Sequence, residues 1–398
     1  MSILQSTFQL KQLPPLSLYI HIPWCIKKCP YCDFNSHSFK NAELPEAQYV
    51  DMLIIDLEQS LPLIWGRSIQ SIFIGGGTPS LFSGEAINKL ITSVRSRVNL
   101  SPYAEITIEV NPGTVERRYI ADYAKAGVNR VSFGVQSFND AHLKTLGRIH
   151  DSSQAVEAIK LAQQYFNNIN LDIIYGLPNQ TVAEALNDIE TAIGFNPSHL
   201  SCYNLTIEPN TAFYKNVPKG IPDNDLCYIM QDALIDKLAA NGYERYEISA
   251  YAKNKRYAQH NLNYWLFGDY LGIGAGAHSK LSFHDKIIRQ ARQKHPLNYM
   301  QAVLDNKHVI EDFIIPTKSL PFEFAMNAFR LIDGVEASLF VKYTGLSLNH
   351  ILATLNMAQT KGFLDFKGDL LKPTPKGQDF LNDFLILFLE DTNDETNN

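Results

Sequence analysis

The chain has 398 residues, of which 45% are hydrophobic and 19% are charged, and its net charge is −6. This composition predicts a globular protein. A single hydrophobic core rarely extends over so long a chain, so the length predicts a main domain and a smaller one. No segment approaches the ~18 uninterrupted apolar residues of a membrane-spanning helix. The acidic balance and the lack of a long basic run argue against nucleic-acid binding.

The first residues and the cysteine count indicate the compartment. Residues 1–10 lack the basic region and the apolar core of a secretory signal, so we expect a reducing, cytoplasmic location. Peripheral contact with the inner membrane stays open. The five cysteines are then free thiols or metal ligands. Two of them, Cys202 in an apolar run and Cys227 in a helical pattern, are expected to be buried side chains without a role.

Short β-branched runs alternate with helical patterns from about residue 16 to residue 280. The predicted strands are 16–22, 71–74, 105–110, 130–135, 170–175 and 200–206. The clearest predicted helices, with a period of about 3.6 residues, are 45–60, 153–165 and 181–193. This succession predicts an α/β fold with a parallel sheet, which right-handed crossovers curl toward a barrel. Its active site is expected at the carboxyl ends of the strands.

Three cysteines follow the first predicted strand with the spacing C-x3-C-x2-C: Cys25, Cys29 and Cys32. Thiolates so close in sequence can converge on one inorganic centre. A [4Fe-4S] cluster needs four ligands, so one iron would stay open to a ligand that is not protein. The alternative is a structural zinc site, in which His37 would complete a tetrahedral Cys3His set. The spacing alone leaves both open.

The second predicted strand is followed by Gly75-Gly76-Gly77-Thr78-Pro79. Consecutive glycines let the backbone turn tightly and bring its N–H and C=O groups close to a ligand. Taken alone, the run is as typical of an ordinary turn. A structural zinc site gives no reason for such a loop after the cysteines, so the two motifs together favour the cluster.

Polar residues also lie at the ends of the next strands. Glu109, Gln136 and Asp172 stand on the third, fourth and fifth predicted strands, and Arg148 follows in Leu-Gly-Arg-Ile-His. A charged residue inside an apolar strand needs solvent, an ion pair or a bound ligand as its partner. Arg148 suits a carboxylate, which its guanidinium group can bind at two points.

The cysteine spacing resembles that of the radical S-adenosylmethionine (radical SAM) superfamily, whose enzymes have a partial (β/α)6 barrel. In that superfamily the open iron binds S-adenosylmethionine, and an electron from the cluster releases a 5′-deoxyadenosyl radical. Gly-Gly-Gly-Thr-Pro matches the segment that holds the methionine amino group. Tyr19 matches a further contact, although a core position explains it equally well. The resemblance implies S-adenosylmethionine contacts from Tyr19, Gly76, Gly77, Thr78, Glu109, Gln136, Arg148 and Asp172.

Within the superfamily, residues 19–178 resemble the oxygen-independent coproporphyrinogen III oxidase group, which acts in haem biosynthesis. Three departures favour its haem chaperones of the HemW type over its dehydrogenases. Cys32 is followed by Asp33 and Phe34, where the dehydrogenases carry a further cysteine, and the segment before the cluster is shorter. Residues 260–265, His-Asn-Leu-Asn-Tyr-Trp, match the HNxxYW motif of the chaperones.

The HNxxYW motif contains a candidate haem ligand. A nitrogen of His260 can bind haem iron, and the nearby aromatic rings can pack on the macrocycle. A histidine held by backbone groups is the equally weighted alternative. A second candidate is His278, in the glycine-rich stretch 268–279 that also matches the group.

From Pro321 the pattern becomes helical, with a hairpin around Gly368 and a final helix over 376–389, in the outline of a winged helix. Its charge is not basic enough for DNA, and the resemblance implies a helical domain over the barrel mouth. We predict a barrel over 1–280, a connecting segment over 281–320, this small domain over 321–389 and a disordered acidic tail over 390–398.

The resemblance covers about residues 16–389 and implies a haem chaperone with a [4Fe-4S] cluster, S-adenosylmethionine and haem as cofactors. Its partners would be apo respiratory haem proteins and, if the cluster is reduced, an electron donor such as flavodoxin or ferredoxin; a monomer and a dimer are both compatible. No catalytic residue is assigned, and enzymatic activity stays open. The alternatives are an oxygen-independent coproporphyrinogen III dehydrogenase and a radical SAM enzyme that acts on another substrate.

Overall fold

The structure is a computed structural model, and it describes residues 9–39, 44–113 and 118–389. The acidic tail, predicted to be disordered, lies outside the described residues. None of the helices in those ranges is long and apolar enough to cross a membrane.

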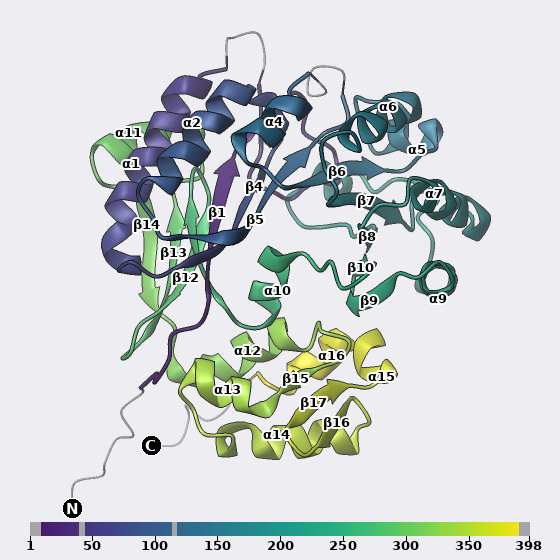
Figure 1. The fold of residues 1–398 in the computed structure, drawn as a ribbon. Helices are drawn as coiled ribbons and strands as arrows, with labels where there is room; N and C mark the ends of the chain where they lie inside the picture. Colours follow the sequence, from purple (N-terminus) through teal and green to yellow (C-terminus); the bar gives the residue numbers. More distant parts are fainter. Residues whose placement is uncertain (1–8, 40–43, 114–117, 390–398) are drawn as a thin grey trace, which may run out of the picture.

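The main body is one large mixed sheet with helices against it (Figure 1). Its strand order is β14-β13-β12-β11-β1-β4-β5-β6-β7-β8-β10-β9. Seven neighbouring strands run parallel. One is β11 (Asp269–Ile273), and the other six are β1 (Leu16–Ile22), β4 (Ile69–Gly76), β5 (Leu100–Val110), β6 (Arg130–Gln136), β7 (Ile169–Tyr175) and β8 (His199–Asn204). They confirm the six predicted strands and the α/β fold class. At the far edge, β9 (Glu244–Glu247) and β10 (Ala250–Ala252) are antiparallel.

Several of the helices that connect these strands begin at a capping side chain. Ser83, Asp151 and Thr181 accept hydrogen bonds from backbone N–H groups of the first helical turns. The three predicted helices form, with ends shifted by a few residues. The bounds are α1 (Glu46–Ile64), α2 (Gly84–Arg95), α4 (Ile120–Ala126), α5 (Asp140–Thr145), α6 (Ser152–Ala162), α7 (Val182–Gly194), α8 (Ala212–Lys215) and α9 (Asn224–Ala240).

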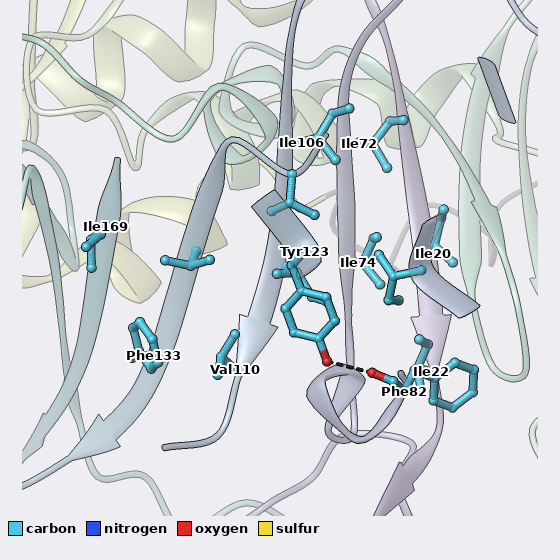
Figure 2. Packing of buried hydrophobic residues seen from close by; sticks show 14 of the residues in the cluster. Ile20, Ile22, Ile72, Ile74, Phe82, Ile106, Val110, Tyr123, Phe133 and Ile169 are labelled. Atoms are coloured by element: carbon cyan, nitrogen blue, oxygen red, sulfur yellow. Dashed lines mark hydrogen bonds between the residues drawn. The ribbon is translucent and has the colours of Figure 1, made fainter. Parts of the chain in front are cut away.

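The main core lies between the parallel strands and these helices. Figure 2 shows the aliphatic side chains of alternate strand positions, such as Ile72 and Ile74 on β4, packed around Tyr123. The hydroxyl of Tyr123 donates a hydrogen bond of 2.6 Å to the carbonyl oxygen of Phe82, so its polar atom is satisfied inside the core. Each fully buried aliphatic side chain of this kind stabilises the fold by roughly 1.5–3 kcal/mol. The opposite side chains of the same strands remain available for a cavity.

Residues 281–320 are not the connecting segment that we predicted. They complete β12 (His278–Ser282) and form β13 (Ile287–Arg292), α11 (Pro296–Leu304) and β14 (Val309–Ile314), which extend the sheet beyond β11 (Asp269–Ile273). Buried polar contacts hold this extension to α1. Asp56 accepts a 2.7 Å hydrogen bond from the hydroxyl of Tyr299 and lies 3.4 Å from the guanidinium group of Arg292. Charged residues interrupt the apolar pattern of these strands, so the pattern did not predict the strands.

The C-terminal region forms a second hydrophobic core. It contains α12 (Leu320–Ala328), α13 (Ala337–Thr344), α14 (Asn349–Thr360) and a three-stranded sheet of β15 (Val335–Glu336), β16 (Leu364–Lys367) and β17 (Leu370–Pro373). The predicted final helix is wrong as a single helix, because it divides at Phe380 into α15 (Pro375–Asp379) and α16 (Leu381–Ile386). This break lets the ring of Phe384 stack on those of Phe329 and Phe363.

The position of this small domain also differs from the expectation. It lies at the amino-terminal ends of the parallel strands, next to α10 (Gln259–Trp265), rather than over their carboxyl ends (Figure 1). The guanidinium group of Arg330 forms a 3.0 Å ion pair with Glu247 and lies 4.4 Å from the ring centre of Trp265. The predicted elements carry no information about which end of the sheet a later domain covers.

Candidate functional site

The three clustered cysteines lie on one short loop at the carboxyl end of β1. Cys25 ends β2 (Trp24–Cys25), which pairs with β3 (His37–Ser38), and the segment between these two short strands carries Cys29 and Cys32. All three side chains line one cavity of about 490 Å³. The sequence neighbours thus become spatial neighbours on the wall of a single cavity.

Burial raises the pKa of the Cys25 and Cys32 thiols. A bound cationic centre lowers the pKa of the thiols again, because metal ligation favours the thiolate.

His37, the fourth ligand of the zinc alternative, has its Nε2 atom 3.2 Å from both the side-chain oxygen of Asn35 and the carbonyl oxygen of Lys294. Within the described ranges, no three His, Cys, Asp or Glu side chains are grouped to hold a single metal ion.

The glycine loop packs directly against the cysteine loop. The backbone N–H groups of Gly77 and Thr78 donate to the carbonyl oxygens of Ile22 and Trp24, at 2.8 and 2.7 Å. A Cβ atom at position 77 would lie 2.5 Å from the carbonyl oxygen of Trp24, so only glycine allows this approach. The hydroxyl of Thr78 also donates to the Cys25 sulfur at 3.4 Å. The two motifs therefore form one wall of the cavity.

Arg148 joins the cysteine loop to the end of β6. Its guanidinium group donates to the Cys29 sulfur at 3.5 Å, to the carbonyl oxygen of Gly134 at 2.8 Å and to the side chain of Asn111. The Nε atom is buried and has no hydrogen-bond partner within the described ranges. Gln136, at the end of the same strand, has a φ of 71° and also lines the cavity. A half-buried cation beside the thiols is suited to hold an anionic group there.

Two carboxyl groups face the cavity from β5 and β7, which lie on either side of β6. The Oε2 atom of Glu109 accepts a 3.0 Å hydrogen bond from the backbone N–H of Gly76. Burial, together with repulsion from Asp172, raises the pKa of Glu109 to about 8. Burial also raises the pKa of Asp172, although Asn170 and Ser132 donate to its oxygens at 2.8 and 3.1 Å. At neutral pH Glu109 can therefore donate as well as accept hydrogen bonds.

Two predicted site residues lie outside the set of side chains that line the cavity. The hydroxyl of Tyr19 is 2.9 Å from Nδ1 of His21, and its half-buried ring lies next to that of Phe73. His260 is also buried, and both of its ring nitrogens have partners: Nδ1 is 3.0 Å from the hydroxyl of Ser71, and Nε2 is 2.7 Å from that of Tyr264. Burial lowers the pKa of His260 to about 3.

Haem ligation by either predicted histidine has little geometric support. In His260 neither nitrogen is available to iron without the loss of a buried hydrogen bond. His278 is exposed at the start of β12 and does not line the cavity. Ligation by His260 stays a prediction, and the contacts favour the alternative of a structural histidine, although its partners are side chains rather than the expected backbone groups.

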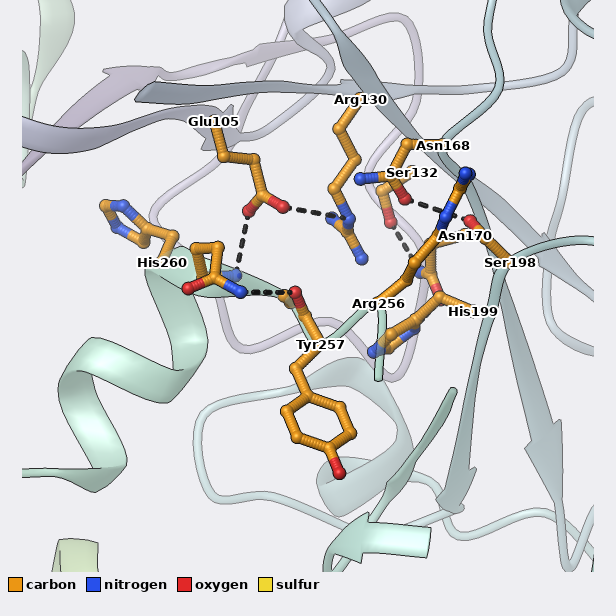
Figure 3. Close-up of polar contacts among 12 residues, drawn as sticks. Glu105, Arg130, Ser132, Asn168, Asn170, Ser198, His199, Arg256, Tyr257 and His260 are labelled. Carbon is orange, nitrogen blue, oxygen red and sulfur yellow. Dashed lines mark hydrogen bonds and ion pairs between the residues drawn. The ribbon is translucent and has the colours of Figure 1, made fainter. Parts of the chain in front are cut away.

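The inner part of the cavity was not predicted from the sequence. Arg130 and Ser132 on β6, with Asn170 on β7, line it together with the predicted Gln136 and Asp172. Figure 3 shows Arg130, Ser132 and Asn170 and the polar residues around them. The polar lining residues of β6 and β7 occupy every second strand position, opposite the apolar ones that face the helices. A search for alternation with a period of two would have found them.

Two parts of this chain match known protein families. Residues 19–192 match the radical SAM superfamily, and residues 315–380 match the HemN C-terminal domain. A solved structure of coproporphyrinogen III oxidase (HemN) from Escherichia coli, described as a radical SAM enzyme, covers 94% of this chain and 90% of its own with a TM-score of 0.80. Its sequence identity is 24%, so this likeness shows the fold alone.

Two curated relatives match nearly the whole chain. Heme chaperone HemW of Escherichia coli (strain K12) is 49% identical over 381 residues, which cover 95% of this chain and 99% of the relative. Heme chaperone HemW of Haemophilus influenzae is 46% identical over 384 residues, which also cover 95% of this chain and 99% of the relative. The chain therefore belongs to the HemW family of the radical SAM superfamily.

Proposed function

We propose that this protein is a haem chaperone that carries a [4Fe-4S] cluster and S-adenosylmethionine, binds haem and delivers it to respiratory haem proteins. The observation that carries this proposal is the 49% identity to a heme chaperone over 95% of the chain. The cavity supports it, because three thiols, the half-buried Arg148 and two carboxyl groups line the same space.

The cysteine loop has the donor set for the cluster. Cys25, Cys29 and Cys32 would hold three irons, and the bound cluster would supply an electron-transfer centre with one iron open to S-adenosylmethionine. Thr78 and Arg148 contact the sulfurs of Cys25 and Cys29 and would stabilise their thiolates by hydrogen bonding. An external donor such as flavodoxin or ferredoxin would reduce the cluster.

The remaining groups fit the parts of S-adenosylmethionine. Arg148, with its unpartnered Nε atom, suits the methionine carboxylate. Gly76 and Gly77 line the cavity where the amino group would lie, and Glu109 and Asp172 suit the ribose hydroxyls, with which they can exchange hydrogen bonds. Gln136 would contact the adenosyl part. Tyr19 would act indirectly, through His21 and Phe73, rather than by lining the cavity.

Haem transfer tests this function against the dehydrogenase alternative. The anaerobically reconstituted protein should bind haem tightly and pass it to an apo haem protein, as followed by the absorption spectrum of the acceptor. Conversion of coproporphyrinogen to protoporphyrinogen by the same preparation would contradict the chaperone assignment. Cys29→Ala should lose the iron-sulfur absorption, and stoichiometric zinc in the wild-type protein would contradict the cluster assignment.

A further inference from the structure

The side chain of Arg130 is a buried cation that forms no hydrogen bond with the residues that the structure describes. Arg130 is the first residue of β6, its side chain is 3% exposed, and its Nε atom is buried without a hydrogen-bond partner. Its single ion pair within the described ranges is with Glu105, and the distance of 3.9 Å between Nε and Oε2 is too long for a hydrogen bond. Burying a charge in this way is costly unless a further group completes its contacts.

The neighbours of Arg130 already use their own hydrogen-bonding capacity (Figure 3). The other oxygen of Glu105 accepts from the backbone N–H of Gln259, at 2.9 Å, where α10 begins. Asn170 donates to Ser132 and Asp172, and its Oδ1 atom lies 2.6 Å from Nδ1 of His199. The guanidinium group therefore faces the cavity with its donors free, while the polar groups around it are paired.

Arg130 lies far from the cysteine loop. Six residues of one extended strand separate it from Gln136, which corresponds to roughly 20 Å along β6. An anionic group bound at Arg130 would therefore lie at a different place from one bound at Arg148, although both arginines line the same cavity. Between the two ends, the cavity wall includes apolar and aromatic side chains, among them Phe73, Ile174 and Tyr203.

We propose that Arg130 binds a carboxylate of the ligand that occupies the inner part of the cavity, and that this carboxylate is a propionate of haem. The identity of the ligand rests on the proposed function. A guanidinium group binds a carboxylate at two points, and the carboxylate of Glu105, at 3.9 Å, is too far away to form a hydrogen bond with it. The apolar part of the wall suits the flat, largely hydrophobic porphyrin ring.

The experiment removes the charge from the protein and from the ligand in turn. Haem and haem dimethyl ester, which lacks the carboxylates, are titrated into the wild-type protein and into Arg130→Gln. We expect the wild-type protein to bind haem about tenfold more tightly than the ester, a difference of about 1.4 kcal/mol. Arg130→Gln should lose this preference by weakening haem binding while leaving ester binding within about twofold. Arg130→Lys keeps the positive charge but cannot bind a carboxylate at two points as a planar guanidinium group does, so it should retain part of the preference.

Glu105→Gln is the matched control. It can still accept from Gln259, but it removes the negative charge beside Arg130, so haem should bind as tightly as before or more tightly. Structural damage would instead weaken binding in both variants. Equal binding of haem and ester by the wild-type protein, or equal losses for both ligands in Arg130→Gln, would overturn the proposal. A loss of S-adenosylmethionine binding in Arg130→Gln without a loss of haem binding would also overturn the proposal. A wild-type protein that binds no haem would instead contradict the proposed function itself.

Discussion

Gly276 leaves the space that the side chain of Asn35 occupies, because a Cβ atom at position 276 would lie 2.3 Å from the Asn35 Nδ2 atom. This nitrogen donates to the carbonyl oxygens of Ala275 and Lys294, both at 2.9 Å. The carbonyl oxygen of Asn35 in turn lies 2.8 Å from Nε2 of His21. The turn after β11 thus holds the cysteine loop in place from a position about 240 residues away in sequence.

We predict that Gly276→Ala prevents stable cluster assembly. Alanine at this position would displace Asn35 and would also be strained, because φ is +79°. Gly242→Ala is a matched control, since its φ of +78° imposes the same strain while nothing lies within 4 Å. Both variants should lose about 1–2 kcal/mol of stability from the backbone strain. Iron per chain after anaerobic reconstitution should fall in Gly276→Ala alone, and equal iron contents would contradict the coupling.

The raised pKa of Glu109 predicts a pH dependence of stability. In the unfolded chain Glu109 ionises near its ordinary pKa of 4.5, whereas in the folded protein it keeps its proton up to a pKa of about 8. The folded state then binds more protons across this window, so the contribution of Glu109 to stability falls as pH rises from 4.5 to 8. In Glu109→Gln this loss is absent.

Chemical unfolding of the ligand-free protein at several pH values measures this effect. The free energy of unfolding of Glu109→Gln, relative to the wild-type protein, should increase steadily between pH 5 and pH 8. Glu46→Gln is a control, because Glu46 also accepts hydrogen bonds, from Ser83, but lies outside the cavity. A difference between Glu109→Gln and wild type that stays constant with pH would contradict the raised pKa.

Periodicity and motif spacing predicted the parallel strands and the end of the sheet at which the motifs meet. The structure brings Cys25, Gly77 and Arg148 to one cavity because parallel strands all end on the same side. The inner cavity escaped prediction for a physical reason. Arg130 and Ser132 alternate with Val131 and Phe133, so the strand reads as apolar overall, and its polar face is visible only when alternate positions are separated.

Contacts between segments that are distant in sequence could not be predicted either. The pattern 260–265 left a haem ligand and a structural histidine equally open, and in the structure the 3.0 Å contact of His260 with Ser71 links α10 to β4. Likewise, the contact of Arg330 with Glu247 places the small domain at the amino-terminal ends of the strands. Both arrangements depend on contacts between residues that are distant in sequence, which local propensity does not encode.

Arg148→Lys should separate cofactor binding from cluster binding. A lysine has one charged nitrogen and cannot contact Cys29, Gly134 and an incoming carboxylate at once. We expect affinity for S-adenosylmethionine to fall about tenfold, with iron content unchanged. Equilibrium dialysis of the reconstituted protein measures the affinity. Arg256→Lys is the control, because Arg256 is exposed and donates to a backbone oxygen, that of Asn167. Similar losses in both variants would contradict a specific role.

His260→Gln tests whether the histidine of the HNxxYW motif is structural. Glutamine can replace only part of the contacts with Ser71 and Tyr264, so one buried polar group loses its partner. The free energy of unfolding should fall by about 1–3 kcal/mol at neutral pH. The Soret band of the haem complex should keep its wavelength, because neither nitrogen of His260 reaches iron in this arrangement.

The pH dependence of this loss provides a second signature. In the folded protein the pKa of His260 is lowered to about 3, whereas in the unfolded chain it titrates near 6.5. The unfolded state therefore binds more protons below pH 6.5, and the wild-type protein loses up to about 1.4 kcal/mol per pH unit that His260→Gln does not lose. The two stabilities should converge as pH falls from 6.5 to 5. A shifted Soret band with unchanged stability would instead identify His260 as a haem ligand.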